Sequence, residues 1–347
     1  MLGQLRARFH DWFYRPRLDW IQVEINTQCN ARCIYCPAAK PGREWPPKKM
    51  PLEIFETILP KLAMSASPSH WREPIIHLQG WGEPFLNPDF FAMAEATKRA
   101  GCAVGTTTNA TLVDEAIAAR IVDTGIDVIS FSVAGIDERN DPIRPGTSLE
   151  QVLGAIAMLQ RIKADRSSAT PAIHIAYMLL KSGIDDIEQI PDLFAGRGIE
   201  QIVISTLTVI ADPAVRHEVI EPATPAEFQI LEHRLARAAE HAKERGIELH
   251  YDIPHNRHSW PGRPPGLCAE NISRAIVVTV DGEVTPCMLN RFRAEDDPRP
   301  NPNPFHFGKL AEQSLADIWW SDGYLRFRRT FWDAEPPARC RACQKLG

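Results

Sequence analysis

The sequence lacks the features that would place a protein in or across a membrane. No run of roughly 18 apolar residues is present, and the start of the chain contains no apolar core of a signal peptide. Neither sign of charge is in large excess, because the formal net charge is only −5. A strongly basic surface of the kind that binds nucleic acids is therefore not expected. These absences predict a cytoplasmic protein that contacts neither membrane nor nucleic acid.

Composition limits the architecture further. Apolar residues make up 44% and charged residues 24% of the 347 residues, which is ordinary for a globular protein and excludes a disordered, collagen-like or coiled-coil chain. Cysteines stay reduced in the cytoplasm, so the 8 cysteines are expected to act as metal ligands or nucleophiles and not as disulfides.

Strand-like and helix-like segments alternate through residues 21–210. Strands are predicted at 21–25, 75–79, 103–108, 126–133, 172–180 and 199–207, and helices near 51–63, 88–100, 112–122, 148–163 and 186–195. Strict alternation predicts a parallel sheet covered by helices, which is an α/β fold. Six units suit a partial (β/α)6 barrel, but an open doubly wound sheet has the same pattern, and periodicity alone does not separate the two.

The rest of the chain is predicted to form a connector and a small second domain. A helix near 225–245, a strand at 247–253 and a Pro/Gly-rich linker at 254–266 precede a β-hairpin at 275–287, where Asp281-Gly282 suits a two-residue turn. A turn-rich loop at 295–304 and a helix near 314–331 follow. The predicted division is an N-terminal extension at 1–20, a core at 21–210, a connector at 211–262 and a cysteine-bearing domain at 263–347.

Three cysteines lie together directly after the first predicted strand. Cys29, Cys33 and Cys36 have the spacing C-x3-C-x2-C, at the edge of the sheet where parallel α/β folds place their chemistry. A fully ligated 4Fe–4S cluster needs four cysteines, so three thiolates leave one iron open to a small molecule. The structural alternative is a zinc site, although structural zinc sites usually show two such cysteine pairs close together.

This loop resembles the hallmark of the radical S-adenosylmethionine (SAM) superfamily, in which an aromatic residue precedes the third cysteine. The resemblance extends over about residues 20–347. It implies that the open iron binds the amino and carboxylate groups of SAM and that one electron cleaves the sulfonium. The 5′-deoxyadenosyl radical formed in this way would abstract a hydrogen from the substrate. The resemblance also favours the partial barrel over the open sheet.

Further motifs follow the next strands in the order that this family shows. Gly80-Trp81-Gly82-Glu83-Pro84 is similar to the family's Gly-Gly-Glu-Pro motif, with Trp81 in place of the first glycine. The resemblance assigns SAM contacts to Tyr35, Gly82, Glu83, Asn109, Ser132 and Arg144. Taken singly, such an acid, asparagine or serine at a strand end is more often structural. Their occurrence at consecutive strand ends favours a cosubstrate site.

Polar residues inside the predicted strands give a weaker indication of a substrate site. Glu24 with Asn26, and His77 with Gln79, are each two residues apart, and His174 lies in the fifth strand. A period of two places each pair on one face of the sheet. If that face lines the lumen of a barrel, the lumen is polar and could hold a substrate. The alternative is that these side chains are buried and form hydrogen bonds within the protein.

A second group of cysteines lies near the end of the chain. Cys268, Cys287, Cys340 and Cys343 match one fully ligated 4Fe–4S cluster, with a zinc ribbon as the alternative. Residues 307–331 and the last cysteine pair resemble the SPASM and twitch domains of many radical SAM enzymes, which implies an auxiliary cluster that transfers electrons. Cys102 is left over and is interpreted as a small buried apolar side chain.

The resemblance implies a radical SAM oxidoreductase with SAM and two 4Fe–4S clusters, one held by three cysteines and one by four. The most specific hypothesis is oxidation of a sugar or aminocyclitol alcohol, with the auxiliary cluster as electron acceptor. Peptide modification, such as thioether formation, crosslinking or epimerisation, is the alternative within the family. A non-catalytic zinc-binding scaffold is the alternative of another class. Expected partners are the small-molecule or peptide substrate and a reductant such as flavodoxin or ferredoxin.

Overall fold

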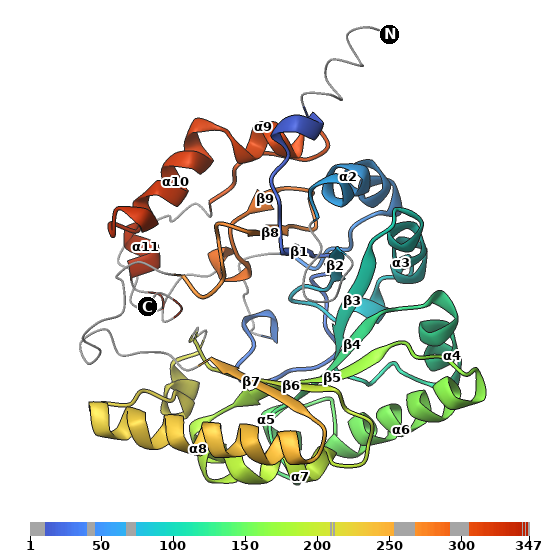
Figure 1. Cartoon of the computed structure of the whole chain (residues 1–347), viewed down its shortest axis with the longest axis vertical. Coiled ribbons are helices and arrows are strands. Elements are labelled where there is room, and N and C mark those ends of the chain that lie inside the picture. The colour runs from blue at the N-terminus through green and yellow to red at the C-terminus, as the bar shows by residue number, and fades with distance from the viewer. Residues whose placement is uncertain are drawn as a thin grey trace, which may run out of the picture.

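The computed structural model describes residues 11–39, 46–66, 74–208, 210, 212–252, 268–291, 305–341, 343 and 345. The linker predicted at 254–266 and the loop predicted at 295–304 lie outside these residues. Figure 1 shows one curved sheet with most of the helices around its outside. Within the described residues no helix combines the length and the apolar character that a bilayer crossing requires.

One sheet runs through the whole structure. Its strands are β1 (Trp20–Val23), β2 (Ile75–Leu78), β3 (Ala103–Thr108), β4 (Val128–Val133), β5 (Ala172–Leu179), β6 (Gln201–Thr206), β7 (Glu248–Asp252), β8 (Ala275–Val278) and β9 (Val284–Thr285). Their order is β7-β6-β5-β4-β3-β2-β1-β8-β9, with β1 to β7 neighbouring one another in chain order and pairing in parallel. From β2 to β7 each strand is added on the same side of the sheet, whereas a doubly wound sheet divides its strand–helix units between the two sides of the first strand. Only the C-terminal strands β8 and β9 lie on the other side of β1. The barrel-type prediction is therefore confirmed.

Helices follow the strands as alternation predicts. They are α2 (Leu52–Ser65), α3 (Phe90–Arg99), α4 (Glu115–Thr124), α5 (Asn140–Ile143), α6 (Leu149–Asp165), α7 (Ile190–Phe194), α8 (Pro225–Glu244), α9 (Leu315–Trp319), α10 (Asp322–Trp332) and α11 (Ala338–Arg341). The side chain of Ser148 begins α6 by accepting a hydrogen bond from the Gln151 N–H at 3.1 Å, and Gln151 reciprocates in a capping box.

Two predicted helices differ from the observed elements. The segment predicted at 186–195 is a 3₁₀ helix over Lys181–Gln189 that continues into the short α7. The single helix predicted near 314–331 is divided into α9 and α10. Ser321 causes the break, because its extended backbone and its side chain, which accepts from the Tyr324 N–H, start a new helix there.

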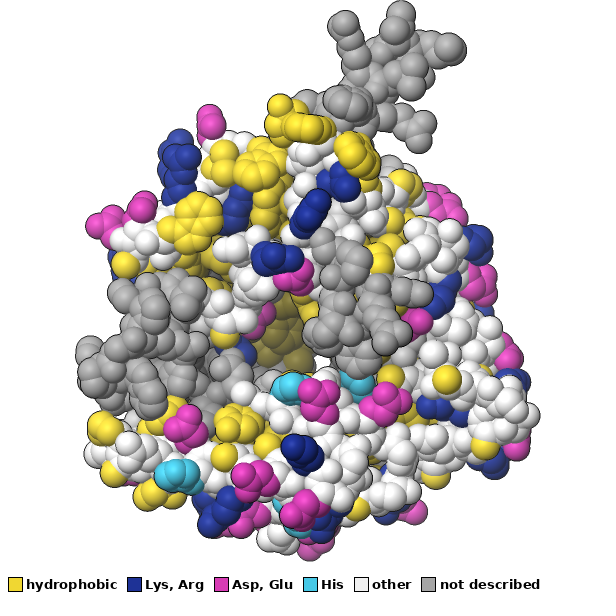
Figure 2. Space-filling model, viewed as in Figure 1, with side chains coloured by type: hydrophobic (Ala, Val, Ile, Leu, Met, Phe, Trp, Pro, Cys, Tyr) yellow, Lys and Arg dark blue, Asp and Glu magenta, His cyan; other side chains and the backbone are white. Residues whose placement is uncertain are grey.

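Alternation along the strands separates an apolar outer face from a polar inner face. Ile21, Val23 and Ile25 of the first strand region are fully buried in the main apolar core. Each such side chain stabilises the fold by roughly 1.5–3 kcal/mol. Gln22 and Glu24 alternate with them and face the lumen of the barrel. Figure 2 shows that the molecule is hollowed near the middle of one face, with histidine side chains at the edge of the hollow.

The C-terminal hairpin is continuous with the barrel. β8 pairs in parallel with β1, opposite to the side that β2 occupies, and β9 pairs antiparallel with β8. The predicted hairpin is present, but the two-residue turn expected at Asp281-Gly282 is wrong. The Thr279 N–H donates to the Glu283 carbonyl at 2.9 Å, so the loop has three residues, Val280, Asp281 and Gly282. Gly282 ends it with a φ of 78°, a conformation that glycine adopts without strain. The second cysteine group is therefore attached to the barrel through strand pairing.

Candidate functional site

The first cysteine loop leaves β1 and is held by the loop that follows α5. The Arg32 N–H donates to the Pro145 carbonyl at 2.7 Å, and the Ile34 N–H donates to the Ile143 carbonyl at 3.0 Å. Within the loop the Cys36 N–H donates to the Cys33 carbonyl at 3.0 Å, which folds the C-x2-C part into a turn. The three thiols are therefore presented by backbone that is fixed by its own turn and by residues 143–145.

Burial makes Cys29 and Cys36 poor thiolates in the absence of a metal. It raises the pKa of the Cys29 thiol above its usual value and raises the pKa of Cys36 to about 12. A positively charged iron centre reverses this effect, because a coordinating thiol is deprotonated outright. Three soft ligands on one loop, Cys33 buried and Cys29 and Cys36 half-buried, fit an iron–sulfur cluster.

Glu83 is the centre of a buried hydrogen-bond network at the ends of β2 and β3. The Thr108 hydroxyl donates to one carboxylate oxygen at 2.7 Å, and the Asn109 N–H donates to the other at 2.9 Å. Glu83 is 2% exposed, and burial raises its pKa to about 7 even though both hydrogen bonds favour the charged form. A buried carboxylate of this kind is suited to bind an ammonium group.

Gly82 packs directly on the segment that precedes the cysteine loop. A Cβ at this position would lie 2.3 Å from the Gln28 carbonyl oxygen, so only glycine fits. The Gly82 N–H donates to the Asn26 carbonyl at 3.1 Å, and the Asn26 side chain donates to the Glu83 carbonyl at 2.7 Å. Asn26, noted from the sequence as a lumenal residue, thus holds the glycine–glutamate motif against β1.

Asn109 links β3 to the cysteine loop. Its side-chain amide donates to the Asn30 side chain at 2.9 Å and lies 3.7 Å from the Cys29 Sγ. An amide donor beside a thiolate ligand favours the charged sulfur and fixes its position. The predicted members Cys29, Glu83 and Asn109 are therefore close together in space, although they follow three different strands.

Arg144 pairs with Tyr35 of the cysteine loop. The Arg144 guanidinium donates to the Tyr35 hydroxyl at 2.5 Å, and both side chains are largely shielded from water. Arg144 is 4% exposed, yet its Nε has no hydrogen-bond partner within the part of the chain that the structure describes. A buried guanidinium with a free donor fits an incoming carboxylate.

Ser132 lies apart from these contacts. It is half-buried in β4 and pairs with Ala176 of β5. Thr108, which donates to Glu83, is not among the residues that the sequence predicts for the site, although it directly precedes the predicted Asn109. Its position at the end of a strand, next to a predicted site residue, is the sequence feature that could have identified it as part of the site.

The residues present fit SAM and a cluster with one open iron. The three thiols supply the soft ligands, Glu83 supplies a carboxylate for an ammonium group, and Arg144 supplies a buried donor for a carboxylate. Amino and carboxylate groups are the two polar ends of SAM that the family resemblance assigns to this position.

The second cysteine group surrounds an apolar cavity in the C-terminal domain. The residues that line it are Cys268, Glu270, Ile272, Pro286, Cys287, Leu289, Asn290, Phe305, Phe327, Phe331, Cys340, Cys343 and Lys345. The Cys343 N–H donates to the Cys340 carbonyl at 3.0 Å, which folds the last pair into a turn. Burial raises the pKa of Cys268 to about 12, and it also raises the pKa of Cys287 well above its usual value. Four soft ligands from three segments fit a fully ligated cluster.

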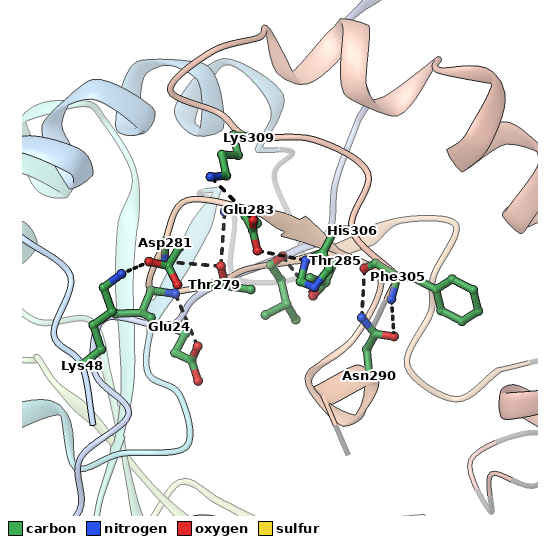
Figure 3. A network of polar contacts seen from close by, with 12 residues as sticks. Glu24, Lys48, Thr279, Asp281, Glu283, Thr285, Asn290, Phe305, His306 and Lys309 are labelled. Carbon is green, nitrogen blue, oxygen red and sulfur yellow. Dashed lines mark hydrogen bonds and ion pairs between the residues drawn. The ribbon is translucent and has the colours of Figure 1, made fainter. Parts of the chain in front are cut away.

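A polar network stiffens the hairpin between the two sites (Figure 3). The Val280 N–H donates to the buried Glu24 carboxylate at 3.4 Å, and Lys48 pairs with Asp281 at the turn. Farther along, the Asn290 side chain donates to the Phe305 carbonyl at 2.9 Å and accepts from the Phe305 N–H at 3.0 Å. The wall of the second cavity is thus tied to the barrel.

Cys102 takes no part in either site. Its side chain is 2% exposed and packs in the main apolar core, as predicted for a small apolar residue.

Two protein families match this chain. Residues 23–194 match the radical SAM superfamily, and residues 268–344 match the SPASM iron-sulfur cluster-binding domain. The two matched ranges contain the three-cysteine loop and the four-cysteine cavity, respectively.

Curated proteins and solved structures are similar over most of the chain. A tungsten-containing aldehyde ferredoxin oxidoreductase cofactor-modifying protein of Pyrococcus furiosus is 25% identical over 324 residues, covering 90% of this chain and 83% of that protein. A PqqA peptide cyclase of Methylorubrum extorquens is 23% identical over 337 residues, covering 93% and 77%. The crystal structure of Streptococcus suis SuiB bound to S-adenosylmethionine has a TM-score of 0.67 and 14% identity, covering 90% of this chain and 68% of that one, and shows a shared fold.

The matched domains are those that bind SAM and 4Fe–4S clusters, and their ranges coincide with the two sites described above. The chain belongs to the radical SAM superfamily and carries a C-terminal SPASM domain.

Proposed function

We propose that this enzyme oxidises an unactivated C–H group of its substrate by two electrons in total. When bound, the three-cysteine cluster supplies the electron that cleaves the sulfonium of SAM, and the four-cysteine cluster supplies a one-electron acceptor. Hydrogen abstraction removes one electron with the hydrogen atom, and the acceptor takes the second as a proton leaves. The observation that carries the proposal is that all four cysteines of the second group line one cavity. A cluster held by all four would have no open position for a substrate on the metal.

The residues of the first site have separate tasks in this proposal. Cys29, Cys33 and Cys36 hold the cluster, and Asn109 orients the first of these ligands. Glu83 and the backbone around Gly82 bind the amino group of SAM, while Arg144 binds its carboxylate and is held by Tyr35. Ser132 contributes a hydroxyl to the lumen, where it would contact the ribose.

The part of the lumen around Gln22, Gln79 and the two strand histidines offers neutral hydrogen-bonding groups. The Thr107 hydroxyl donates to the Gln79 side chain at 2.7 Å, which donates in turn to the Gln22 side chain at 3.2 Å. Burial, with the nearby His174 as a smaller cause, lowers the pKa of His77 to about 3, and burial lowers that of His174 to about 4. Both rings are therefore neutral near pH 7, and such a lining suits amide and hydroxyl groups of a substrate.

A peptide is the substrate class that we favour. The similarity to the PqqA peptide cyclase, over 93% of this chain, supports this class. The sugar or aminocyclitol alcohol expected from the sequence has no comparable support and serves as the competing substrate in the test. An electron carrier such as flavodoxin or ferredoxin would supply the electron for SAM cleavage.

The test is metal content and SAM cleavage in the full chain, reconstituted with iron and sulfide without oxygen. We expect a brown protein with about eight irons per chain, and 5′-deoxyadenosine after reduction with dithionite. A colourless zinc protein that releases no 5′-deoxyadenosine would contradict the proposal. Peptides encoded beside the gene and aminocyclitols are then compared, and a mass loss of two hydrogens in one of them identifies the substrate class.

A further inference from the structure

Trp81 departs from the family motif and reaches from the SAM site to the SPASM domain. It occupies the position of the first glycine in the Gly-Gly-Glu-Pro pattern. Its half-buried indole donates from Nε1 to the carbonyl of Met288 at 3.4 Å. Met288 directly follows Cys287, a predicted ligand of the second cluster. A glycine at this position would have no side chain with which to make this contact.

The backbone of Trp81 is fixed to the first cysteine loop. On its C-terminal side the Gly82 N–H donates to the Asn26 carbonyl at 3.1 Å, and the Glu83 N–H donates to the Gln28 carbonyl at 2.7 Å. Gln28 directly precedes Cys29, so the carbonyl that accepts this second hydrogen bond belongs to the peptide bond that leads into the first cysteine ligand. Close packing of Gly82 on the Gln28 carbonyl leaves no room for this segment to shift independently.

The acceptor side of the contact is equally well supported. The Thr285 hydroxyl donates to the Cys287 carbonyl at 3.4 Å, and Thr285 lies in β9 of the hairpin whose other strand pairs with β1. Figure 3 shows this hairpin and the Glu24 and Lys48 side chains that hold its turn. Trp81 therefore spans two rigid elements that carry the two cysteine sites, with its indole as the connecting group.

We infer that Trp81 is a positioning residue that couples SAM binding at the first site to the electronic state of the second cluster. The inference rests on the proposed function, because it requires both clusters. An ammonium group bound at Gly82 and Glu83 acts on the backbone adjoining Trp81. The indole N–H then transmits the displacement to the carbonyl beside Cys287, and hydrogen bonds and dipoles around a thiolate ligand set the reduction potential of its cluster.

The test uses S-adenosylhomocysteine, which has the amino and carboxylate groups of SAM but no sulfonium to cleave. The midpoint potential and the low-temperature paramagnetic signal of the auxiliary cluster are measured in the reconstituted full chain, with and without this probe. We expect the probe to shift both in the wild type. Trp81→Phe, which keeps a ring but loses the N–H, should lose most of the shift, and Trp81→Gly should lose all of it.

A matched control removes the same kind of hydrogen bond elsewhere in the SPASM domain. The Trp320 Nε1 donates to the Tyr14 carbonyl at 2.6 Å, so Trp320→Phe should keep the full probe-induced shift. Binding of the probe is measured by calorimetry in every variant.

Four outcomes would overturn the inference. An unchanged shift in both Trp81 variants, or no shift in the wild type with about eight irons bound, would show that Trp81 couples nothing. Lost probe binding in Trp81→Phe would make it a binding residue instead. Only about four irons per chain would defeat the proposed electron acceptor as well, so iron content separates the failure of this inference from the failure of the proposed function.

Discussion

The two cysteine sites differ in how the chain assembles them. The first takes its three cysteines from residues 29–36 of one loop, and polar side chains from later strands surround that loop. The second takes four cysteines from residues 268–343, and aromatic rings form much of its cavity wall. A local loop with an incomplete ligand set and a buried carboxylate and guanidinium is suited to a polar cosubstrate. A complete set inside an apolar wall is suited to hold an electron and exclude other ligands.

The largest effect should come from removing a ligand of the first site. Cys33→Ala leaves two thiols on the loop, which is too few to hold a cluster at this position. SAM cleavage, measured as 5′-deoxyadenosine released after reduction, should fall below detection, and about four of the eight irons should be lost. Cys102→Ala is the control, because Cys102 is buried in the apolar core and should leave both readings unchanged. If SAM cleavage persisted in Cys33→Ala, the three-cysteine loop would not be the site of cleavage, and the two cysteine sites would not differ in function as described.

Removing a ligand of the second site should separate SAM cleavage from oxidation of the substrate. In Cys287→Ala the first cluster remains, so SAM cleavage should continue at a rate within about threefold of the wild type, because the SAM-binding side chains are untouched. Net oxidation of the substrate should stop, because the electron acceptor is lost. Both products are quantified in one reaction by mass spectrometry. Equal substrate turnover in Cys287→Ala and in the wild type would refute the electron-acceptor role.

An intermediate effect is expected at Glu83. Replacing one partner of a buried charge pair costs about 2–5 kcal/mol, so Glu83→Gln should weaken SAM binding by roughly 30- to 4,000-fold. The pKa of Glu83 is about 7 in the absence of a ligand, and the ammonium group requires the carboxylate form. Affinity in the wild type should therefore fall about tenfold for each pH unit below 7 and level off above it.

Glu83→Gln removes the titrating group and provides the control for that profile. Its SAM affinity, measured by calorimetry between pH 5.5 and 8.5, should not show the loss between pH 7 and pH 6 that the wild type shows. An identical profile in both proteins would assign the pH dependence to another group and weaken the assignment of Glu83 to the ammonium.

Local patterns predicted most of the barrel and of the first site. The strand at 103–108 coincides with β3, and the cysteine loop and the motifs after β2 and β3 converge as their strand ends imply. These predictions succeed because parallel strands bring their carboxyl ends to one edge, whatever the sequence distance between them. The spacing of residues within each segment was therefore sufficient to predict which strand ends carry the residues of the first site.

Contacts between distant segments were not predictable in the same way. The pairing of β8 with β1 joins residues more than 250 positions apart, and no local pattern specifies that partner. The sheet thus crosses the boundary predicted at residue 263, and the division into domains stays a prediction. The Arg144–Tyr35 and Trp81–Met288 contacts likewise depend on how separate loops meet, which spacing does not encode.

The smallest effects should come from removing two helix caps, one in the barrel that carries the first site and one in the SPASM domain that carries the second. Ser148→Ala removes the cap of α6 in the barrel, and Ser321→Ala removes the cap of α10 in the SPASM domain. Each should lower the free energy of unfolding by about 1 kcal/mol. Because one hydrogen-bonded sheet joins the two regions, we expect the full, cluster-loaded chain to unfold in one transition that both variants shift equally. A separate early transition in Ser321→Ala alone would show that the second site unfolds independently, and the strand pairing between β1 and β8 would then be too weak to make the two sites one unit.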